Sequence, residues 1–401
     1  MTFRVLLLES IHELARINLA AAGIEVELMD GALTETELAA RLEGVHAVGI
    51  RSKTQMTARV IEAADDLMAI GAFCIGTNQI DLDMATERGV AVFNAPFSNT
   101  RSVAELVLSE IVMLSRGLAD RSREMHVGQW RKTAKGAREV RGKTLGIIGY
   151  GHIGHQIGII AESFGMRVVF HDIVSKLPIG NNTQLTSLEA VLRESDFVSL
   201  HVPATDQTHE MIGANEIAQM KPGAALLNLS RGTVVVIPAL AEALKSGHLS
   251  GAAIDVFPVE PKKNISDDFV SDLRGLENVV MTPHIGGSTM EAQENIGREV
   301  STALANYFHA GGTTGSVNFP EVELPKAAGA HRITNVHQNV PGVLSELNRI
   351  VSEAEGNVTA QVLATQGKLG YLLMDFDQAV ADDVAANMNA LETTLVARAV
   401  R

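Results

Sequence analysis

Residues 145–172 read LGIIGYGHIGHQIGIIAESFGMRVVFHD, and this stretch decides the fold. An apolar run precedes three glycines spaced as GxGxxG, Gly149, Gly151 and Gly154, and an apolar helical pattern follows them. The order of strand, glycine-rich turn and helix predicts a βαβ unit that opens a doubly wound sheet and binds a dinucleotide. A GxGxxG motif is a weak signal by itself, so this prediction depends on the flanking strand and helix.

Each glycine has a physical role in the predicted site. Gly149 permits the tight turn, Gly151 lets the backbone approach a pyrophosphate, and Gly154 lets the helix pack closely on the sheet. The phosphates are expected at the helix N-terminus, where free N–H groups and the positive end of the helix dipole lie. His152 and Ile153, in the same loop, are expected to contact the cofactor.

The next strand ends at Asp172, 18 residues after Gly154. A carboxylate there accepts hydrogen bonds from the adenosine ribose and repels a 2′-phosphate, so the sequence predicts NAD rather than NADP. The alternative interpretation of Asp172 is an exposed turn residue.

Composition limits the class of protein. The chain has 401 residues, 46% hydrophobic and 4% aromatic, which suits two or three α/β domains with cores of Ala, Val, Ile and Leu. A formal charge of −14 argues against nucleic acid or an anionic membrane as a partner. The single cysteine, Cys74, excludes an intrachain disulfide, and no metal site is expected. No apolar run approaches the ~18 residues of a membrane span, so a cytoplasmic location is expected.

Alternating segments predict the rest of the fold. Residues 1–98 alternate strand-like and helix-like runs, which predicts a second doubly wound parallel sheet of the flavodoxin type. Residues 331–401 run strand, helix, strand, strand, helix, strand, and predict a ferredoxin-like βαββαβ module. Long helices are expected from Ser102 to Trp130 and from Thr289 to His309. The Gly- and Pro-containing stretch 310–330 is expected to be a hinge or linker.

These segments predict an α/β protein of three domains. One domain would comprise residues 1–98 and 289–325. A Rossmann domain that binds NAD would comprise residues 99–288, and the C-terminal domain residues 326–401; the resemblances named below imply substrate binding for the first and regulation for the last.

Three further motifs place polar residues directly after predicted strands, where open α/β sheets bind ligands. They are NLSRGTVV at 228–235, IDVFPVEP at 254–261 and TPHIGGST at 282–289. With the glycine loop, they resemble the signatures of the D-isomer-specific 2-hydroxyacid dehydrogenases, and the resemblance covers about residues 1–310.

The resemblance implies a catalytic set of Arg231, Glu260 and His284. His284 would take the hydroxyl proton in oxidation, since imidazole titrates near pH ~6.5, and Glu260 would hydrogen-bond its other ring nitrogen. Arg231 would bind the substrate carboxylate. Singly, such residues are more often solvated charges or caps. His201 is a second candidate base, which we interpret as structural or close to the cofactor. The expected cofactor-binding residues beyond the glycine loop and Asp172 are His201, Pro203, Leu229, Ser230, Arg231, Asp255, His284, Gly286 and Gly287.

The expected substrate carries a phosphate. GIRSKT at 49–54 places two cations and two hydroxyls at a strand end, where they can bind phosphate or carboxylate. By resemblance, Arg51, Ser52, Asn99 and Gln293 contact substrate, and Lys132 enters a neighbouring subunit's cleft. The resemblance also implies the reaction, NAD-dependent oxidation of 3-phospho-D-glycerate to 3-phosphooxypyruvate, the first step of L-serine biosynthesis. Reduction of 2-oxoglutarate to 2-hydroxyglutarate is left open as a side reaction, and ordinary exposed charge is the alternative for Arg51.

The C-terminal module resembles an ACT domain, a regulatory module that binds amino acids. By resemblance, His337, Asn339 and Asn357 bind L-serine at an interface between subunits, in a feedback-inhibited homotetramer. A module that only pairs subunits, without a ligand, stays open.

Two other functions also stay open. A glyoxylate or hydroxypyruvate reductase of the same family would share the catalytic set, but the ACT-like module and the cations at 51–53 weigh against it. A non-enzymatic NAD-sensing protein would share the fold, but the complete set of Arg231, Glu260 and His284 weighs against that function.

Overall fold

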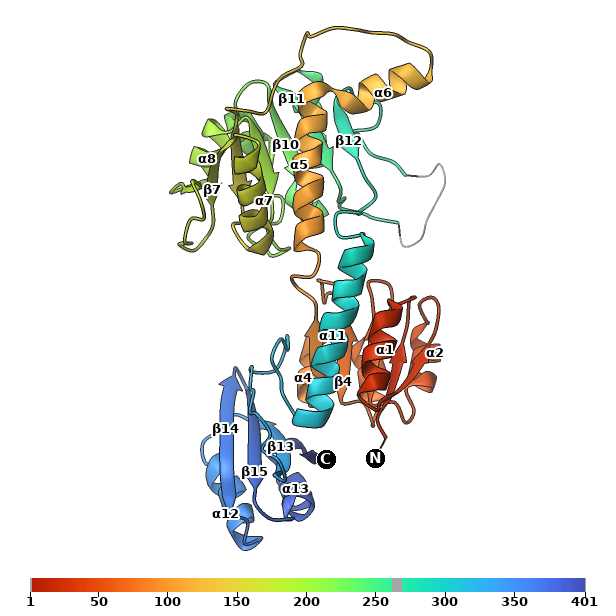
Figure 1. Cartoon of the computed structure of the whole chain (residues 1–401), viewed down its shortest axis with the longest axis vertical. Helices are drawn as coiled ribbons and strands as arrows, with labels where there is room; N and C mark the ends of the chain where they lie inside the picture. The colour runs from red at the N-terminus through yellow and green to blue at the C-terminus, as the bar shows by residue number, and fades with distance from the viewer. Residues whose placement is uncertain (1, 262–268, 401) are drawn as a thin grey trace. The chain divides into compact units, whose positions relative to one another are not determined.

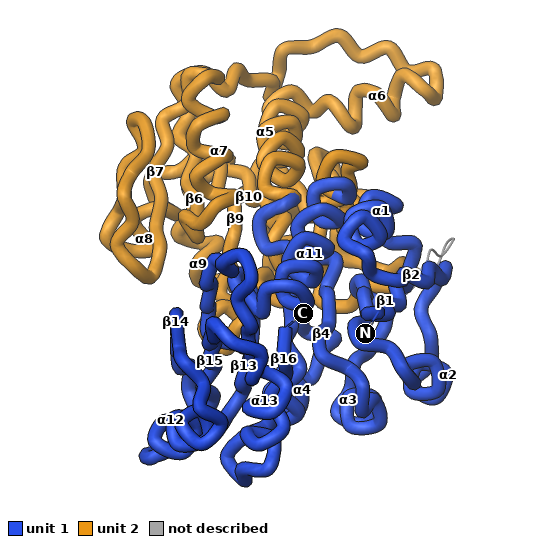
Figure 2. Tube along the Cα trace, turned by 60° about the horizontal axis from the view of Figure 1, so that its bottom comes forward, with its two compact units in different colours: residues 1–98, 293–401 blue, residues 99–292 orange. Residues whose placement is uncertain are grey.

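The computed structural model describes residues 2–261 and 269–400 of the chain. They form two compact units, which Figure 2 colours separately. The first unit comprises residues 1–98 and 293–401, and the second comprises residues 99–292. In the described part of the chain, no helix has both the length and the apolarity to cross a membrane.

The first unit contains a five-stranded parallel sheet in the order β2-β1-β3-β4-β5, the flavodoxin order. Helices α1 and α11 pack on one face through residues such as Leu19 and Val300, and α2, α3 and α4 cover the other. The strands are β1 (Arg4–Leu7), β2 (Glu25–Leu28), β3 (Ala47–Ile50), β4 (Ala69–Ala72) and β5 (Ala91–Asn94). The helices are α1 (Glu13–Ala21), α2 (Glu35–Arg41), α3 (Ala58–Glu62), α4 (Leu82–Glu87) and α11 (Met290–Ala310).

The second unit contains a seven-stranded parallel sheet in the order β12-β11-β10-β9-β6-β7-β8. The order reverses direction between β6 and β9, and ligands of open α/β sheets bind beside such a switch point. Its strands are β6 (Thr144–Ile148), β7 (Arg167–His171), β8 (Thr183–Gln184), β9 (Phe197–Leu200), β10 (Ala224–Asn228), β11 (Leu249–Ile254) and β12 (Val279–Met281).

Helices cover both faces of this second sheet. Figure 1 shows α5 (Thr100–Arg116) and α7 (His152–Ser163) side by side on one face, where they share a core with β6 and β7. The opposite face is covered by α8 (Leu188–Glu194), α9 (Ala214–Gln219) and α10 (Ile237–Lys245). The prediction of two doubly wound sheets is confirmed.

The single helix expected from Ser102 to Trp130 is wrong. Helix α5 ends at Arg116, and α6 (Leu118–His126) begins after Gly117, whose φ of +57° is left-handed. Glycine adopts this conformation without strain, so the helical pattern on both sides hides a break.

The C-terminal module is the expected ferredoxin-like fold. Its antiparallel sheet has the order β14-β15-β13-β16, and α12 and α13 pack on one face. The other face joins the core of the first unit, where Val336 and Tyr371 pack with α11 residues. The elements are β13 (His331–Gln338), α12 (Val343–Glu353), β14 (Val358–Gln366), β15 (Leu369–Phe376), α13 (Ala381–Asn389) and β16 (Thr394–Val400).

The expected hinge at 310–330 is corrected in its first half. Thr313, Phe319 and Val322 are buried, and the Asn318 side chain accepts a hydrogen bond from the backbone of Val92 at 2.8 Å. The segment is therefore packed onto β5 up to about Val322. Its glycines and prolines form turns within a packed segment. The prediction is wrong there because linkers are rich in the same residues.

Candidate active site

The glycine loop after β6 has the shape that a dinucleotide requires. A Cβ on Gly149 would collide with the carbonyl oxygen of His201, and one on Gly154 would lie 2.6 Å from that of Gly149. No described atom comes within 4 Å of a Cβ built on Gly151, the N-cap of α7, so the backbone is open there. No side chain of the described residues caps this helix, which leaves its first N–H groups for phosphate oxygens.

Asp172 lies beside this loop at the end of β7. Its carboxylate accepts hydrogen bonds from the backbone N–H groups of Tyr150 at 2.9 Å and Val174 at 3.2 Å. These contacts fix the carboxylate next to the glycine turn, the place from which it can bind ribose hydroxyls. His152 is exposed and Ile153 half-buried at the start of α7.

His284 and Glu260 form a direct pair. The Nδ1 atom of His284 lies 2.8 Å from Glu260 Oε2, and the other carboxylate oxygen accepts the backbone N–H of Phe257 at 3.0 Å. The His284 side chain is about half exposed, at 53%. An imidazole bonded through Nδ1 presents Nε2 for proton transfer, as a general base requires.

The pair shifts both pKa values in useful directions. The hydrogen bond to Glu260 raises the pKa of His284, although partial burial and the Arg231 charge oppose the rise. Burial acts to raise the pKa of Glu260, but the hydrogen bonds from His284 and Phe257 and the charges of His284 and Arg231 outweigh it and lower that pKa. Glu260 is thus held as a carboxylate that stabilises imidazolium.

Arg231 belongs to the same cluster. Its positive charge acts to lower the pKa of both His284 and Glu260. Its Nη1 donates to the carbonyl of Ser230 at 2.7 Å. Asn228, at the end of β10, holds the turn: its Nδ2 donates to the Arg231 carbonyl at 2.9 Å, and its Oδ1 accepts from Ser230. The ends of β10, β11 and β12 therefore bring all three predicted catalytic residues together.

Asp255 organises the loop that carries His284. Its buried carboxylate accepts from the Thr282 hydroxyl at 2.6 Å and from the N–H groups of Ile285 and Gly286 at 2.8 Å each. The resemblance implies only that this residue belongs to the cofactor-binding set. Nothing in the sequence indicates that Thr282, Ile285 and Gly286 share one buried acceptor, so the sequence offers no signal for this role.

His201 is unsuited to be the base. Its Nε2 bonds the Ser199 hydroxyl at 2.7 Å, its Nδ1 is buried, and burial lowers its pKa to about 3. It remains neutral and lines the glycine turn through its carbonyl.

The other expected cofactor residues of this unit follow β9, β10 or β12: Pro203, Leu229, Ser230, Gly286 and Gly287.

The predicted substrate residues lie in both units. Arg51 and Ser52 follow β3, and Gln293 lies in the first turn of α11. Asn99 precedes α5; its side-chain nitrogen would collide with a Cβ on Gly287, and its Oδ1 is buried without a partner among the described residues. A buried amide oxygen without a partner is suited to receive a ligand's hydrogen-bond donor.

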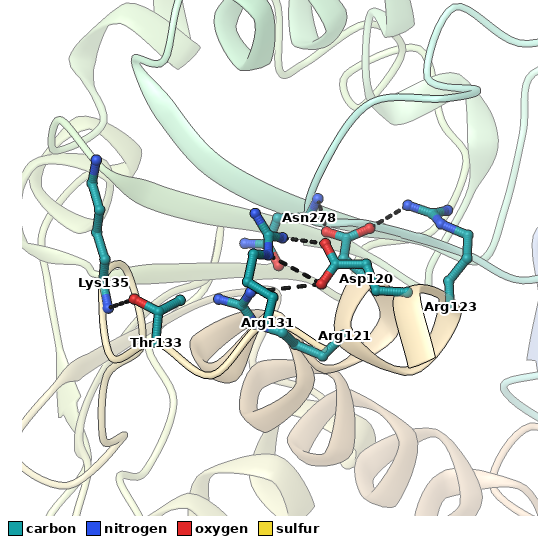
Figure 3. A network of polar contacts seen from close by, with 8 residues as sticks. Asp120, Arg121, Arg123, Arg131, Thr133, Lys135 and Asn278 are labelled. Atoms are coloured by element: carbon teal, nitrogen blue, oxygen red, sulfur yellow. Dashed lines mark hydrogen bonds and ion pairs between the residues drawn. The ribbon is translucent and has the colours of Figure 1, made fainter. Parts of the chain in front are cut away.

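Lys132 lies on an arm formed by α6 and residues 127–137. Figure 3 shows the polar network that holds this arm: Asp120 accepts from the backbone N–H of Asn278 at 2.6 Å and pairs with Arg123. Glu124 pairs with Arg131. The arm also exposes apolar side chains, of which Trp130 is 79% exposed.

The predicted effector residues do not meet within one chain. Asn339 follows the end of β13, and its Nδ2 donates to the Gly367 carbonyl at 3.1 Å. Asn357 precedes β14 at the opposite end of the sheet and donates to Asp377 at 2.6 Å. Asn339 pairs with Lys368 and Asn357 with Asp377, so about nine residues of strand, roughly 30 Å, separate the two. His337 is 1% exposed, and its Nδ1 bonds the Asn335 side chain at 2.7 Å.

Comparisons with known proteins agree with this geometry. Residues 108–286 match the model of the D-isomer specific 2-hydroxyacid dehydrogenase NAD binding domain, and residues 333–396 match the AHAS small subunit-like ACT domain. The chain is 53% identical to the D-3-phosphoglycerate dehydrogenase of Escherichia coli K12, over 98% of this chain and 97% of that one. It is 52% identical to the enzyme of the same name from Haemophilus influenzae, over 98% and 96%.

Solved structures share the fold over 79% of this chain, as two examples show. The TT0316 protein from Thermus thermophilus matches with a TM-score of 0.71 and 33% identity, covering 79% of this chain and all of that one. The D-lactate dehydrogenase from Aquifex aeolicus, solved with NAD and lactic acid, matches with a TM-score of 0.67 and 27% identity over the same shares.

The chain therefore belongs to the D-isomer specific 2-hydroxyacid dehydrogenases, a family of oxidoreductases. Within this family it belongs with the D-3-phosphoglycerate dehydrogenases. Its cofactor is NAD, as the sequence predicts, and the open backbone at Gly151 and the fixed carboxylate of Asp172 fit that group.

Proposed function

We propose that this enzyme oxidises 3-phospho-D-glycerate to 3-phosphooxypyruvate with NAD, the first step of L-serine biosynthesis, in the cytoplasm. The observation that carries the proposal is the His284–Glu260 pair beside Arg231, in a chain about half identical to enzymes named for this substrate. The cations and hydroxyls of residues 51–54, at the end of β3, supply groups that suit a phosphate.

The residues divide the reaction between them. His284 takes the proton of the C2 hydroxyl on Nε2 while Glu260 holds Nδ1 and stabilises the imidazolium that forms. Arg231 holds the substrate carboxylate and stabilises the carbonyl oxygen as it develops. NAD, when bound, supplies the acceptor for the hydride that leaves C2. Asp255 keeps the His284 loop in place through three hydrogen bonds.

A steady-state assay of NADH formation tests the proposal. We expect kcat/KM for 3-phospho-D-glycerate to exceed that for D-glycerate and D-lactate by at least about a hundredfold, because the nonphosphorylated acids leave the phosphate-binding cations unpaired. A preference for a nonphosphorylated acid would favour a glyoxylate or hydroxypyruvate reductase. No NADH with any hydroxy acid would favour an NAD-sensing protein. The same assay in reverse measures whether 2-oxoglutarate is reduced.

We further propose that the enzyme is a homotetramer built on two different subunit contacts. The arm, residues 118–137, carries five Lys or Arg and two acidic side chains, a net charge of +3 in a chain of −14, and exposes Trp130. A basic arm with exposed apolar residues complements the acidic surface of a second subunit. Lys132 lies on this arm, so the contact would bring it to the partner's cleft. The ACT domain supplies the second contact, and two different two-fold contacts close into a tetramer.

We also propose that L-serine binds between ACT domains. Asn339 and Asn357 lie at opposite ends of one sheet, so a site that uses both, together with His337, takes Asn357 from a second subunit. Amide and imidazole groups suit the carboxylate and hydroxyl of serine.

Mixed oligomers test this arrangement. Asn339→Ala and Asn357→Ala should each abolish inhibition by serine. Subunits of the two variants, mixed in equal amounts and reassembled at random, should regain about a quarter of the serine sites, because about half of the ACT pairs are then mixed and one of the two sites in each mixed pair is intact. Absence of binding in the mixture, measured by calorimetry, would contradict the shared site.

A further inference from the structure

Glu9 is a buried acidic residue for which the reaction described above has no role. It follows β1, is 7% exposed, and has a φ of +59°, and Ser10 after it has a φ of +52°. Two consecutive residues other than glycine in the left-handed region cost free energy, which the surrounding contacts must offset. The backbone N–H of Glu9 donates to the Gly31 carbonyl at 3.0 Å, which fixes part of this turn.

The Glu9 carboxylate holds the loop that follows β3. Its Oε1 accepts the backbone N–H groups of Arg51 at 3.1 Å and Thr54 at 2.8 Å, and its Oε2 accepts that of Lys53 at 3.1 Å. Three donors converge on one buried group that only accepts, and hydrogen bonds to a charged acceptor are the stronger kind. Strands β1 and β3 are neighbours in the sheet, so the contact joins two adjacent carboxyl ends.

The same loop is held from its other side. The Nε2 of Gln79 donates to the Arg51 carbonyl at 2.7 Å and lies 3.3 Å from the Gly76 carbonyl. The backbone of residues 51–54 is therefore fixed at four points. These contacts use backbone groups of the loop rather than its side chains. Arg51 is half-buried, and Ser52 and Lys53 are exposed.

We propose that Glu9 is a positioning residue that sets substrate affinity by shaping the loop of residues 51–54. Because its carboxylate occupies the loop's inward N–H groups, an anionic substrate meets the side chains of Arg51, Ser52 and Lys53 rather than the backbone. Glu9 itself does not touch the substrate. This inference rests on the proposed function, which assigns those side chains to the substrate's phosphate or carboxylate.

The requirement is for a carboxylate rather than an amide. In Glu9→Gln, the amide NH₂ would face a backbone N–H, and two donors cannot bond each other. The loop would lose at least one charge-assisted contact and move. In Glu9→Asp, the charge stays but the side chain is one methylene shorter, so an intermediate effect is expected.

Steady-state kinetics of the full-length enzyme test the proposal. For Glu9→Gln we expect KM for 3-phospho-D-glycerate to rise roughly tenfold or more, with kcat within about threefold and KM for NAD unchanged. Glu9→Asp should lie between the wild type and Glu9→Gln. The matched control is Glu62→Gln, an exposed glutamate of α3, which should leave all three values unchanged.

The outcomes separate this inference from the proposed function. An unchanged KM for substrate in Glu9→Gln, or a fall in kcat with KM constant, would overturn the positioning role. If that variant does not fold, Gln79→Ala, which releases the loop from its other side, should raise KM in the same way, and an unchanged KM there would overturn the role. If the wild type itself prefers a nonphosphorylated acid, the proposed substrate fails, and the same ratios are measured with the acid it does oxidise.

Discussion

The backbone of His284 is left-handed, with a φ of +55°, which few residues other than glycine adopt. Its N–H donates to the carbonyls of Asp255 at 2.8 Å and Thr282 at 3.0 Å, and the Asp255 carboxylate fixes the next two residues. Strain of this kind costs about 1–3 kcal/mol and persists where surrounding contacts impose it. Here those contacts place the imidazole against Glu260 before any substrate binds.

The raised pKa of His284 sets the pH dependence of the reaction. Oxidation needs neutral imidazole, so kcat/KM for oxidation should rise with pH through a midpoint above the ordinary value near ~6.5. Reduction needs imidazolium and should persist up to the same midpoint. Glu260→Gln removes the largest cause of the rise, so the midpoint should move to lower pH while the rate falls. The pH profiles of both directions measure this, and a midpoint that does not move would contradict the assigned pair.

Glu110 makes the fold sensitive to pH. This residue of α5 is fully buried, both carboxylate oxygens lack partners among the described residues, and burial, with the charge of Asp255, raises its pKa to about 8. The folded state therefore keeps a proton that the unfolded chain releases near pH 4.5. Its contribution to stability is complete below that pH and declines as pH rises towards 8.

Replacing this carboxyl group should remove the decline. In Glu110→Gln, the fall in unfolding free energy between pH 5 and 8 should be smaller than in the wild type by up to about 1.4 kcal/mol per pH unit. Denaturant unfolding at several pH values measures it, with Glu105→Gln on the exposed side of the same helix as the control. Parallel pH dependences in Glu110→Gln and the wild type would show that Glu110 is ionised in the fold.

At the scale of elements, periodicity and glycine spacing predict both parallel sheets and the βαββαβ module. They also predict that Arg231, Glu260 and His284 lie at the carboxyl ends of strands, because each motif that carries one of these residues directly follows an apolar strand. They miss the break at Gly117, since helical periodicity continues across it, and the packing of Phe319 and Val322, whose burial depends on residues distant in sequence. The sequence does not predict the roles of Asp255 and Glu9 for the same reason. Each carboxylate bonds backbone groups that come close together only in the folded sheet.

Gly232 allows two catalytic loops to lie against each other. A Cβ there would collide with the carbonyl group of Phe257, so the turn after Arg231 and the loop leading to Glu260 would have to separate. Misplacement of about 1 Å can cost roughly a hundredfold in rate, so Gly232→Ala should lower kcat by about that factor. The control is Gly297→Ala in α11, where a Cβ meets nothing nearer than 3.5 Å among the described residues. Near-normal kcat in Gly232→Ala would show that the two loops are not coupled.

At the scale of the whole molecule, the C-terminal module is not a loose appendage of the first unit. Arg332 is fully buried, pairs with Asp375 through two hydrogen bonds of 2.6 and 2.7 Å, and also donates to the carbonyls of Ala310 and Leu324. The Tyr371 hydroxyl donates to the Gly311 carbonyl at 2.7 Å. These contacts join the ACT sheet to the end of α11, so a change in that sheet has a physical connection to the helix that packs on the parallel sheet of the first unit.

The basic arm makes a prediction about assembly. Trp130→Ala removes its largest exposed apolar side chain, and we expect the proposed tetramer to dissociate towards dimers at micromolar concentration, because aromatic anchors dominate such contacts. Sedimentation equilibrium measures the mass. Leu177→Ala, at another exposed apolar residue of the second unit, is the control. An unchanged mass for Trp130→Ala would place the subunit contact elsewhere.

The most direct test of the account combines an activity and a binding measurement on one variant. In His284→Ala, formation of NADH from 3-phospho-D-glycerate should fall by at least about a thousandfold, because the substitution removes the imidazole assigned to take the hydroxyl proton. The affinity for NAD, measured by fluorescence titration, should stay within about threefold, since the glycine loop and Asp172 are untouched. Retained turnover would contradict the assignment of His284 as the base, and loss of NAD affinity together with turnover would give it a structural role instead.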